Sequence, residues 1–180
     1  GIRDIGVTGV QTCALPTFYL YTGTLHLGNA LNHEVNRFYS RKGGNISFGN
    51  SELKVNNSVA EFDSSEINYE PGARIHLAYD LGTSYLYGRR DMSITNYKLP
   101  EIKVNIPRRS LTIYGTLHTE GLLATAGTIV LPNDTSILGY VNTTPVDTGR
   151  LTFSSSTHLR VYGSSFDLSN LKAITPSSGI

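Results

Sequence analysis

The sequence predicts an all-β protein made of short strands that stack as repeats, and three observations support this. The composition favours strands, with 18 Gly, 11 Tyr and 6 Phe in 180 residues, and strong helix formers do not recur at helical spacing. Apolar residues alternate with polar ones along most of the chain, which is the period of a strand. Gly, Asn, Asp or Ser closes each alternating run within a few residues, so the strands are short.

The alternating runs follow one another too closely for long hairpins. Ile46 and Phe48 alternate in ISFGN, and Leu53 and Val55 do so in ELKVNN. Strands of roughly three to five residues, each followed by a tight corner, are the simplest description of this spacing. The remaining runs of this kind are EINYEPG (66–72), RIHLAYD (74–80), SLTIYG (110–115), GRLTFSSS (149–156), HLRVYGS (158–164) and SFDLSN (165–170).

One window, residues 29–43, has apolar residues near helical spacing at Leu31, Val35 and Phe38. It holds Asn, β-branched and aromatic residues in place of strong helix formers. The window is therefore compatible with a helix, with a loop or with an irregular pair of strands.

A short echo within the chain indicates repetition. TGTLHLG (22–28) and YGTLHTEG (114–121) share the letters GTLH, and the same order of apolar residues and turn residues surrounds both. Stacked repeats show such self-similarity, because no single unit can bury its own apolar face. A chance match of four letters is the alternative explanation.

These stretches resemble the β-solenoid repeat regions of large secreted bacterial surface proteins, many of them adhesin-like. The resemblance implies a right-handed parallel β-helix of roughly 20 residues per coil, in which inward apolar residues stack on those of neighbouring coils. It also implies a stalk or adhesive surface located outside the cell or on its surface. A β-sandwich is the rival architecture. The resemblance is carried by GTLHLGN (23–29), NISFGNSELKVNNSVAEFDSSEINYEPGARIHL (45–77), LPEIKVNI (99–106), RRSLTIYGTLHTEGLLATAGTIVLP (108–132) and GRLTFSSSTHLRVYGSSFDLSNLKAI (149–174).

The first sixteen residues are unlike the rest and resemble the in-frame translation of a common short-read sequencing adapter. GIRD (1–4) matches the end of a flow-cell primer region, IG (5–6) fits an index barcode, and VTGVQTCALP (7–16) matches the read-primer region. Such scars are excluded from fold reasoning. We therefore expect residues 1–16 to be an artefact, and residues 17–180 to be a solenoid segment, open at both ends, of a longer protein assembled from metagenomic reads. Cys13 then has no chemical role.

Composition disfavours several classes of function. The net charge is +1 and only 16% of residues are charged, against about a quarter in ordinary domains. Nucleic-acid binders carry a clustered basic patch, whereas the pairs Arg41–Lys42 and Arg89–Arg90 are isolated beside turns. No apolar run approaches the ~20 residues of a membrane helix, and one cysteine excludes a disulfide scaffold. We expect no nucleic-acid partner, no membrane span and no cofactor.

Metal-binding signatures are weak. The histidines occur singly, without H-x-H or H-E-x-x-H spacing, and four of them fall on the outward phase of a strand. We therefore expect imidazoles that face solvent, and no metal site. The five are His26, His33, His76, His118 and His158.

The alternative function is a polysaccharide-active enzyme, a lyase or a hydrolase, because parallel β-helices also carry such enzymes. Paired acids perform glycoside hydrolysis, and clustered acids can hold calcium for a lyase. The candidate residues are Asp80, Arg89 and Asp91 in YDLGTSYLYGRRDM (79–92). The chain lacks a G-x-S-x-G nucleophile elbow.

Two tyrosine-rich stretches, FYLY (18–21) and SYLYGRR (84–90), indicate contact with glycans. Aromatic faces can stack on sugar rings, and Arg can supply hydrogen bonds. Outward tyrosines with hydroxyls in water are the alternative explanation. The leading hypothesis is a non-enzymatic structural or interaction module whose partners are extracellular polysaccharide, a host or matrix surface, and the neighbouring coils of its parent chain. The candidate glycan-binding residues are Tyr85, Tyr87, Arg89, Arg90 and Asp91.

Overall fold

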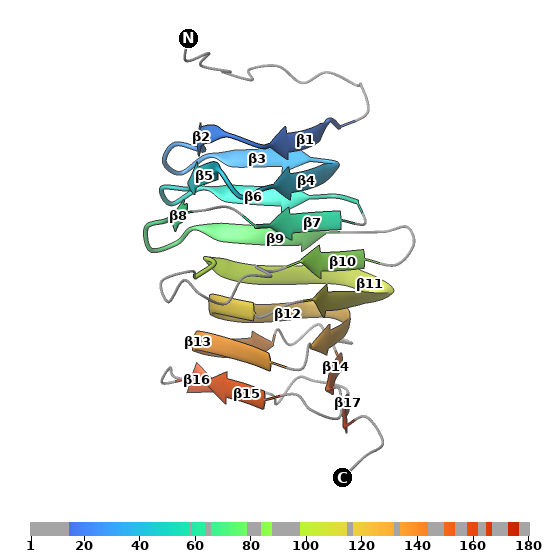
Figure 1. The fold of residues 1–180 in the computed structure, drawn as a ribbon. Helices are drawn as coiled ribbons and strands as arrows, with labels where there is room; N and C mark the ends of the chain where they lie inside the picture. The colour runs from blue at the N-terminus through green and yellow to red at the C-terminus, as the bar shows by residue number, and fades with distance from the viewer. Residues whose placement is uncertain are drawn as a thin grey trace.

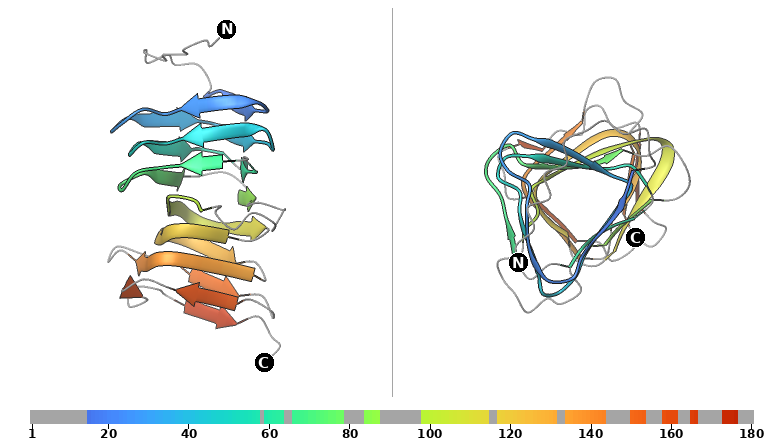
Figure 2. Two further views of the ribbon diagram at one scale, coloured as in Figure 1. Left: turned by 60° about the vertical axis from the view of Figure 1, so that its left-hand side comes forward. Right: turned by 90° about the horizontal axis from the view of Figure 1, so that it is seen from above.

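A computed structural model describes residues 15–57, 59–63, 66–78, 84–87, 98–114, 117–131, 134–143, 150–153, 158–161, 165–166 and 173–176. All the elements in these ranges are strands, stacked in one column (Figure 1). Seen along its axis, the column has a three-sided outline (Figure 2).

Backbone pairing joins the strands into a 14-stranded and a 3-stranded parallel sheet. Each side of the column collects one strand or strand segment from successive coils, and each side is called a sheet below. The first sheet contains β1 (Thr17–Leu20), β4 (Arg37–Ser40), β7 (Val59–Phe62), β10 (Ser84–Tyr87), β14 (Arg150–Phe153) and β17 (Ala173–Pro176). The second contains β3 (Asn32–Val35), β6 (Glu52–Val55), β9 (Arg74–Ala78) and β16 (Ser165–Phe166). The third contains β2 (Gly23–His26), β5 (Gly44–Ser47) and β8 (Glu66–Asn68), and further down β15 (His158–Val161).

The longest strands bend around corners and so contribute to more than one side. These are β11 (Glu101–Tyr114), β12 (Leu117–Leu131) and β13 (Asp134–Thr143). The start of β11 pairs with β9, and its end pairs with β10. Through such pairings β11, β12 and β13 join the upper and lower coils into one column.

Every strand pairing within the described ranges is parallel, and each strand of the upper coils pairs with the equivalent strand of the next coil. Paired strand residues in these coils are 20 to 22 positions apart, close to the expected coil length. The predicted all-β solenoid of stacked parallel strands is therefore confirmed, and the rival β-sandwich is wrong, since that fold needs antiparallel neighbours. The right-handed sense of winding stays a prediction.

The solenoid segment predicted from the sequence begins at Thr17, and β1 begins at the same residue. The backbone carbonyl of Pro16 accepts a hydrogen bond from the N–H of Asn36 at 2.9 Å. Residues 1–14, on which most of the adapter prediction rests, lie outside the described residues.

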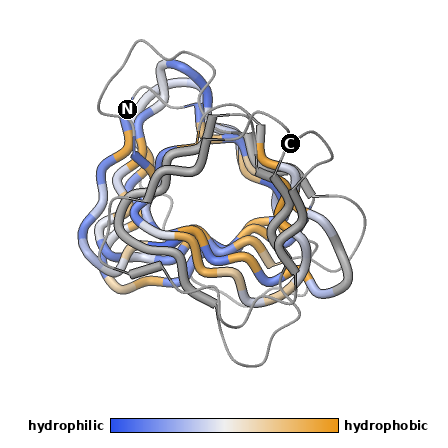
Figure 3. The backbone as a smooth tube through the Cα atoms, turned by 90° about the horizontal axis from the view of Figure 1, so that it is seen from below, coloured by the Kyte–Doolittle hydropathy of each residue, from blue (hydrophilic) through white to orange (hydrophobic). Residues whose placement is uncertain are grey.

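The interior is filled by rows of apolar side chains that continue from coil to coil. Parallel in-register pairing places Leu53, Ile75 and Ile102 in one row, and all three are buried. Hydrophobic and hydrophilic residues alternate along the chain as it winds around the column (Figure 3). Fully burying each large apolar side chain contributes roughly 1.5–3 kcal/mol.

Phenylalanines form a second internal row behind the first sheet. The ring centroid of Phe38 lies 5.5 Å from that of Phe18 and 5.1 Å from that of Phe62. Phe38 and Phe62 are fully buried, and Phe18 packs against the core from the first coil. The aromatic stack therefore ties three successive coils together.

The window 29–43 is a pair of strands, so the helical interpretation is wrong. β3 and β4 occupy it, separated by Asn36. The period of two places Val35 and Phe38 inside, whereas Leu31 is 51% exposed. Pairing with the next coil therefore outweighs the helical spacing of these three residues.

The corner between the third and second sheets depends on glycine. Gly49 has a φ of +55°, and a Cβ there would collide with the backbone carbonyl of Gly28 in the coil above. Beside it, the buried hydroxyl of Ser51 donates to the carbonyl of Gly28 at 2.9 Å and accepts from the N–H of Leu31 at 3.0 Å. These contacts satisfy backbone groups that a tight corner leaves without ladder partners.

Replacing Phe38 by Ala is expected to lower the free energy of unfolding by about 3–5 kcal/mol, because it removes a buried ring from the middle of the aromatic stack. Denaturant unfolding followed by circular dichroism measures the change. Leu31→Ala is the matched control in the same window and should stay within about 0.5 kcal/mol of the parent chain. Equal losses in the two variants would contradict the assigned inward row.

Candidate functional site

The outward surface of β1, β4, β7 and β10, called the tyrosine face below, carries a stack of exposed aromatic rings. The ring centroids of Tyr19 and Tyr39 lie 4.9 Å apart with planes inclined by 7°, and those of Tyr19 and Tyr21 lie 5.9 Å apart with planes inclined by 5°. Tyr19 is 53% exposed and Tyr21 is 59% exposed. Contiguous exposed aromatic surface is typical of interaction sites, whereas single exposed rings are ordinary.

Strand register brings the two tyrosine-rich stretches of the sequence onto this one sheet. Tyr19 pairs with Tyr39, Tyr39 with Glu61, and Glu61 with Tyr87. The row continues to Tyr114. FYLY and SYLY are therefore separated by two strands on the same face, although 60 or more residues separate them in the chain.

The sequence-predicted site residues are only partly placed. Tyr85 and Tyr87 belong to β10, where the backbone is described, and Tyr85 pairs with Val59 and Thr112. Arg89, Arg90 and Asp91 lie outside the described residues, as does Asp80 of the enzyme alternative. Their role in binding or catalysis stays a prediction.

The ring geometry changes the expected mode of contact. Tyr19 and Tyr39 cover one face of each other, so this pair offers ring edges and phenol hydroxyls to a ligand rather than an open platform of ring faces. A tyrosine loses little conformational freedom on contact, because only two side-chain torsions have to be fixed. The stack is thus a preformed surface with hydroxyls at the spacing of the strands.

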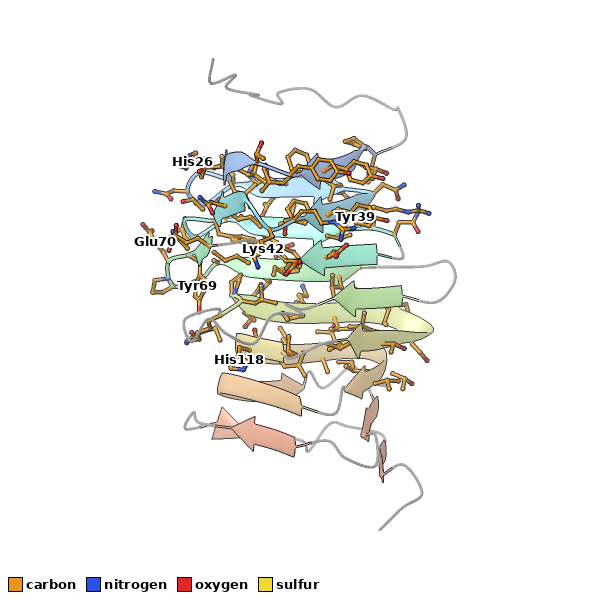
Figure 4. All side chains as sticks on the ribbon, in the orientation of Figure 1. His26, Tyr39, Lys42, Tyr69, Glu70 and His118 are labelled. Carbon is orange, nitrogen blue, oxygen red and sulfur yellow. The ribbon has the colours of Figure 1, made fainter. Side chains whose placement is uncertain are left out.

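Arginines flank the tyrosine stack within β4 and directly after it. Arg37 is exposed, and its backbone pairs with Thr17. Arg41 Nη1 lies 2.9 Å from Oε1 of Glu61, which is only 5% exposed. The ion pair offsets part of the charge of both groups, and the guanidinium is its solvent-facing member. Figure 4 shows Tyr39 of β4 and Lys42 of the following turn on this part of the column.

The outward surface of β3, β6, β9 and the start of β11, called the charged face below, carries alternating charges. Lys54 Nζ donates to Glu34 Oε1 at 2.7 Å, and Asn56 donates to the same oxygen. These hydrogen bonds, with that from Lys54 as the largest influence, hold the pKa of Glu34 below its ordinary value. Arg74 pairs with Glu52 at 3.7 Å and with Glu101. Lys54 and Arg74 are thus matched by carboxylates.

His76 departs from the expectation of solvent-facing histidines, which is wrong at this position. It is on the charged face but only 8% exposed, and its Nδ1 lies 2.9 Å from Glu52 Oε1. Register places it between Lys54 and Lys103 in one row. Its Nε2 is buried without a hydrogen-bond partner in the described structure. Burial lowers the pKa of His76, and this outweighs the opposing effect of Glu52.

The other histidines vary. His26 is exposed and His118 is half-buried, both on the third sheet (Figure 4). The ring of His33 stands in the inward row above Leu53, and its Nε2 lies 2.6 Å from the carbonyl oxygen of Leu27. The side chain of His158 lies outside the described part. No group of His, Cys, Asp or Glu suited to a metal ion occurs among the described residues.

A hollow of about 360 Å³ lies beside the turn between β8 and β9, near Tyr69 and Glu70 in Figure 4. Tyr69 donates a hydrogen bond to Glu120 Oε2 at 3.2 Å, and burial together with Glu120 raises the pKa of the phenol. Lys98 forms an ion pair with Glu120 as well. Glu101, also at the hollow, is buried against Arg74. Two of the acids at this hollow are therefore held by basic partners.

Comparison with protein-family models, with curated proteins and with solved structures found no match to this chain. Among the described residues, no helix has the length and apolar character required to cross a membrane.

Sequence reasoning concentrated on residues 84–91 and missed Arg37 and Tyr39. Both lie in the window whose apolar spacing also fitted a helix. The signal that identifies them is the alternation in RFYS. Phe38 and Ser40 are buried there, whereas Arg37 and Tyr39 are on the outward side of the strand. Sequence reasoning also missed the pairing of His76 with Glu52, since strand phase does not indicate which neighbours cover a side chain.

The free energy of unfolding is expected to fall as the pH decreases from about 7.5 to about 5. His76 has a folded pKa below its ordinary 6.5, so the unfolded chain takes up the proton first, and the stability that depends on the neutral ring is complete above 6.5 and lost below it. Urea midpoints across this range measure the effect. Glu34, whose pKa is lowered from 4.5, acts only at more acidic pH.

His76→Gln should flatten this pH dependence, because the amide does not titrate. His26→Gln, at an exposed position, is the matched control and should leave the slope as it is in the parent chain. If the slope survives in His76→Gln, the histidine is not its source.

Proposed function

We propose that this chain is a non-enzymatic structural and interaction module of a secreted or cell-surface bacterial protein. It acts as a stalk or adhesin-like surface, and its tyrosine face contacts extracellular polysaccharide or a host or matrix surface. The single observation that supports this most is the preformed stack of Tyr19, Tyr21 and Tyr39, in which Tyr19 and Tyr21 are exposed and Tyr39 is half-buried.

The solenoid architecture suits a stalk. Each coil contacts only its neighbours, so the column extends by addition of coils without a change in its packing. The interior of the described coils is filled by apolar side chains. A rigid column presents its outward residues at fixed positions, and this lowers the entropy lost when they bind a partner.

A polysaccharide would contact the tyrosine face by hydrogen bonds and by edge contacts. The phenol hydroxyls can both donate to and accept from sugar hydroxyls. The stacked rings are already ordered by each other, so few rotamers remain to be fixed. Repeated weak contacts of this kind along one polymer add up through multivalency.

The second candidate is a polysaccharide-active enzyme, and the hollow beside β8 is the observation that favours it. Glycoside hydrolysis requires two carboxyl groups at a defined separation, one of them carrying a proton. At this hollow Glu101 accepts from Arg74, and Glu120 accepts from Tyr69. Glu101 and Glu120 thus already have structural partners, and Glu70, the third acid at the hollow, is exposed. A pair of acids with one held protonated is not evident among these three, and this favours the binding module over the enzyme.

The double variant Tyr19→Ala, Tyr39→Ala is expected to lose binding to polysaccharide by roughly tenfold or more, because each aromatic anchor contributes about 1 kcal/mol or above. Affinity electrophoresis of the full chain in gels containing single polysaccharides, neutral and acidic, measures the retardation. Thr24→Ala, His26→Ala removes two exposed side chains of the third sheet and serves as the matched control. If no polysaccharide retards the parent chain, the proposed glycan contact fails.

The enzyme alternative has its own experiment. The parent chain is incubated with each polysaccharide, and new reducing ends and unsaturated uronate absorbance are followed. We expect no product above background. Product that disappears in Glu101→Gln or Glu120→Gln would assign catalysis to the hollow, and product that disappears in Asp80→Asn or Asp91→Asn would assign it to the sequence-predicted residues.

A further inference from the structure

We infer that the polysaccharide bound by the tyrosine face is acidic and carries uronate carboxylates. This inference rests on the proposed function and names its ligand class. It follows from the charges that surround the tyrosine stack, which differ in balance from those on the charged face.

Arg37 is the first of these charges. It precedes Tyr39 by two residues on β4, so the two side chains share the outward side of the strand. It is exposed, and it has no ion-pair partner among the described residues. The residue paired with it in the coil above is Thr17, which is neutral. A guanidinium held beside an aromatic row without a carboxylate is available to a ligand.

Arg41 is the second charge. It follows Tyr39 by two residues and is half-exposed, with its side chain at 47%. Its partner Glu61 is buried, so the pair presents the guanidinium and not the carboxylate to solvent. Asp63, just after β7, is the other described acid near this edge and is half-buried. The exposed charge around the tyrosines is therefore mainly positive.

The charged face provides the contrast. There Lys54 faces Glu34, and Arg74 lies between Glu52 and Glu101. Each of these two cations has a carboxylate from a neighbouring coil. Lys103, the third cation described on that face, has no ion pair among the described residues, but three carboxylates, Glu34, Glu52 and Glu101, lie on the same face. Among the described residues, the arginines beside the stacked tyrosines lack exposed counter-charges, because Arg37 is unpaired and the carboxylate that pairs with Arg41 is buried.

The chemistry of a uronate fits this arrangement. Its carboxylate accepts two parallel hydrogen bonds from a guanidinium, which gives direction as well as attraction. Its ring hydroxyls can meet the phenol hydroxyls of Tyr19 and Tyr39. Arg37 and Arg41 lie on either side of Tyr39 along the strand, so a polysaccharide chain lying along β4 places a sugar against Tyr39 and carboxylates against the arginines.

The experiment compares polygalacturonate with the same polymer after methyl esterification, which removes the charge and keeps the backbone. Affinity electrophoresis of the full chain is expected to show about tenfold tighter binding to the charged polymer. Raising the salt should weaken binding to that polymer and leave binding to the ester unchanged.

Arg37→Gln should weaken binding to polygalacturonate about three- to tenfold and leave binding to the ester unchanged. Lys103→Gln, which removes a positive charge from the charged face, is the matched control and should bind like the parent chain. Thermal unfolding of both variants checks that they fold.

Three results would overturn the inference. Equal binding of the two polymers would show that charge does not matter, while the proposed function would stand. Equal losses in Arg37→Gln and Lys103→Gln would indicate attraction by overall charge without a site. Retention of neither polymer, with neutral polysaccharides retained, would exclude the acidic ligand, whereas retention of no polysaccharide at all would defeat the proposed function itself.

Discussion

The structure depends on in-register parallel pairing between successive coils. Each backbone hydrogen-bonds to the coil above and to the coil below, so a side chain lies directly over the residue of the same phase in the next coil. Phe38 thus stacks on Phe18, and Tyr39 on Tyr19. The interior aromatic row and the surface aromatic row are two sides of the same strand pair, which means that the packing that stabilises the column also orders its contact surface.

The same pairing explains why the three sides differ in character. The charge of an outward residue determines which charge is favoured directly above and below it. Like charges in adjacent coils repel, and opposite charges attract. Glu34 over Lys54, and Glu52 over Arg74, follow this rule. The row of Tyr39 contains Glu61, and there the neighbouring Arg41 compensates the charge. Burial of Glu61 keeps this interruption from exposing a negative group within an aromatic row.

Much of the fold could be predicted from the sequence, because the alternation that places Leu53, Val55 and Ile75 inside is local and needs no knowledge of neighbours. The rows could not be predicted. Coil length varies from 18 residues between Leu111 and Ile129 to 27 between Arg74 and Glu101, so the residue that lies above another cannot be found by counting along the chain. For this reason the alignment of FYLY with SYLY, and the burial of His76 between Lys54 and Lys103 in one row, appear only in three dimensions. The spacing of Leu31, Val35 and Phe38 did not distinguish a helix from strands. Three apolar residues at this spacing fit a helical period, and they also fit two short strands separated by Asn36.

The separation of 4.9 Å between the rings of Tyr19 and Tyr39 equals the distance between neighbouring strands of any sheet. Each coil therefore adds one strand spacing, about 4.7–4.9 Å, to the length of the column. Duplicating or deleting a whole coil shifts every group beyond it by one strand spacing along the axis. The angular position of these groups around the axis stays nearly unchanged. The axial distance between the tyrosine face and any other surface of such a column can therefore change in fixed steps, without a change in the tyrosine face itself.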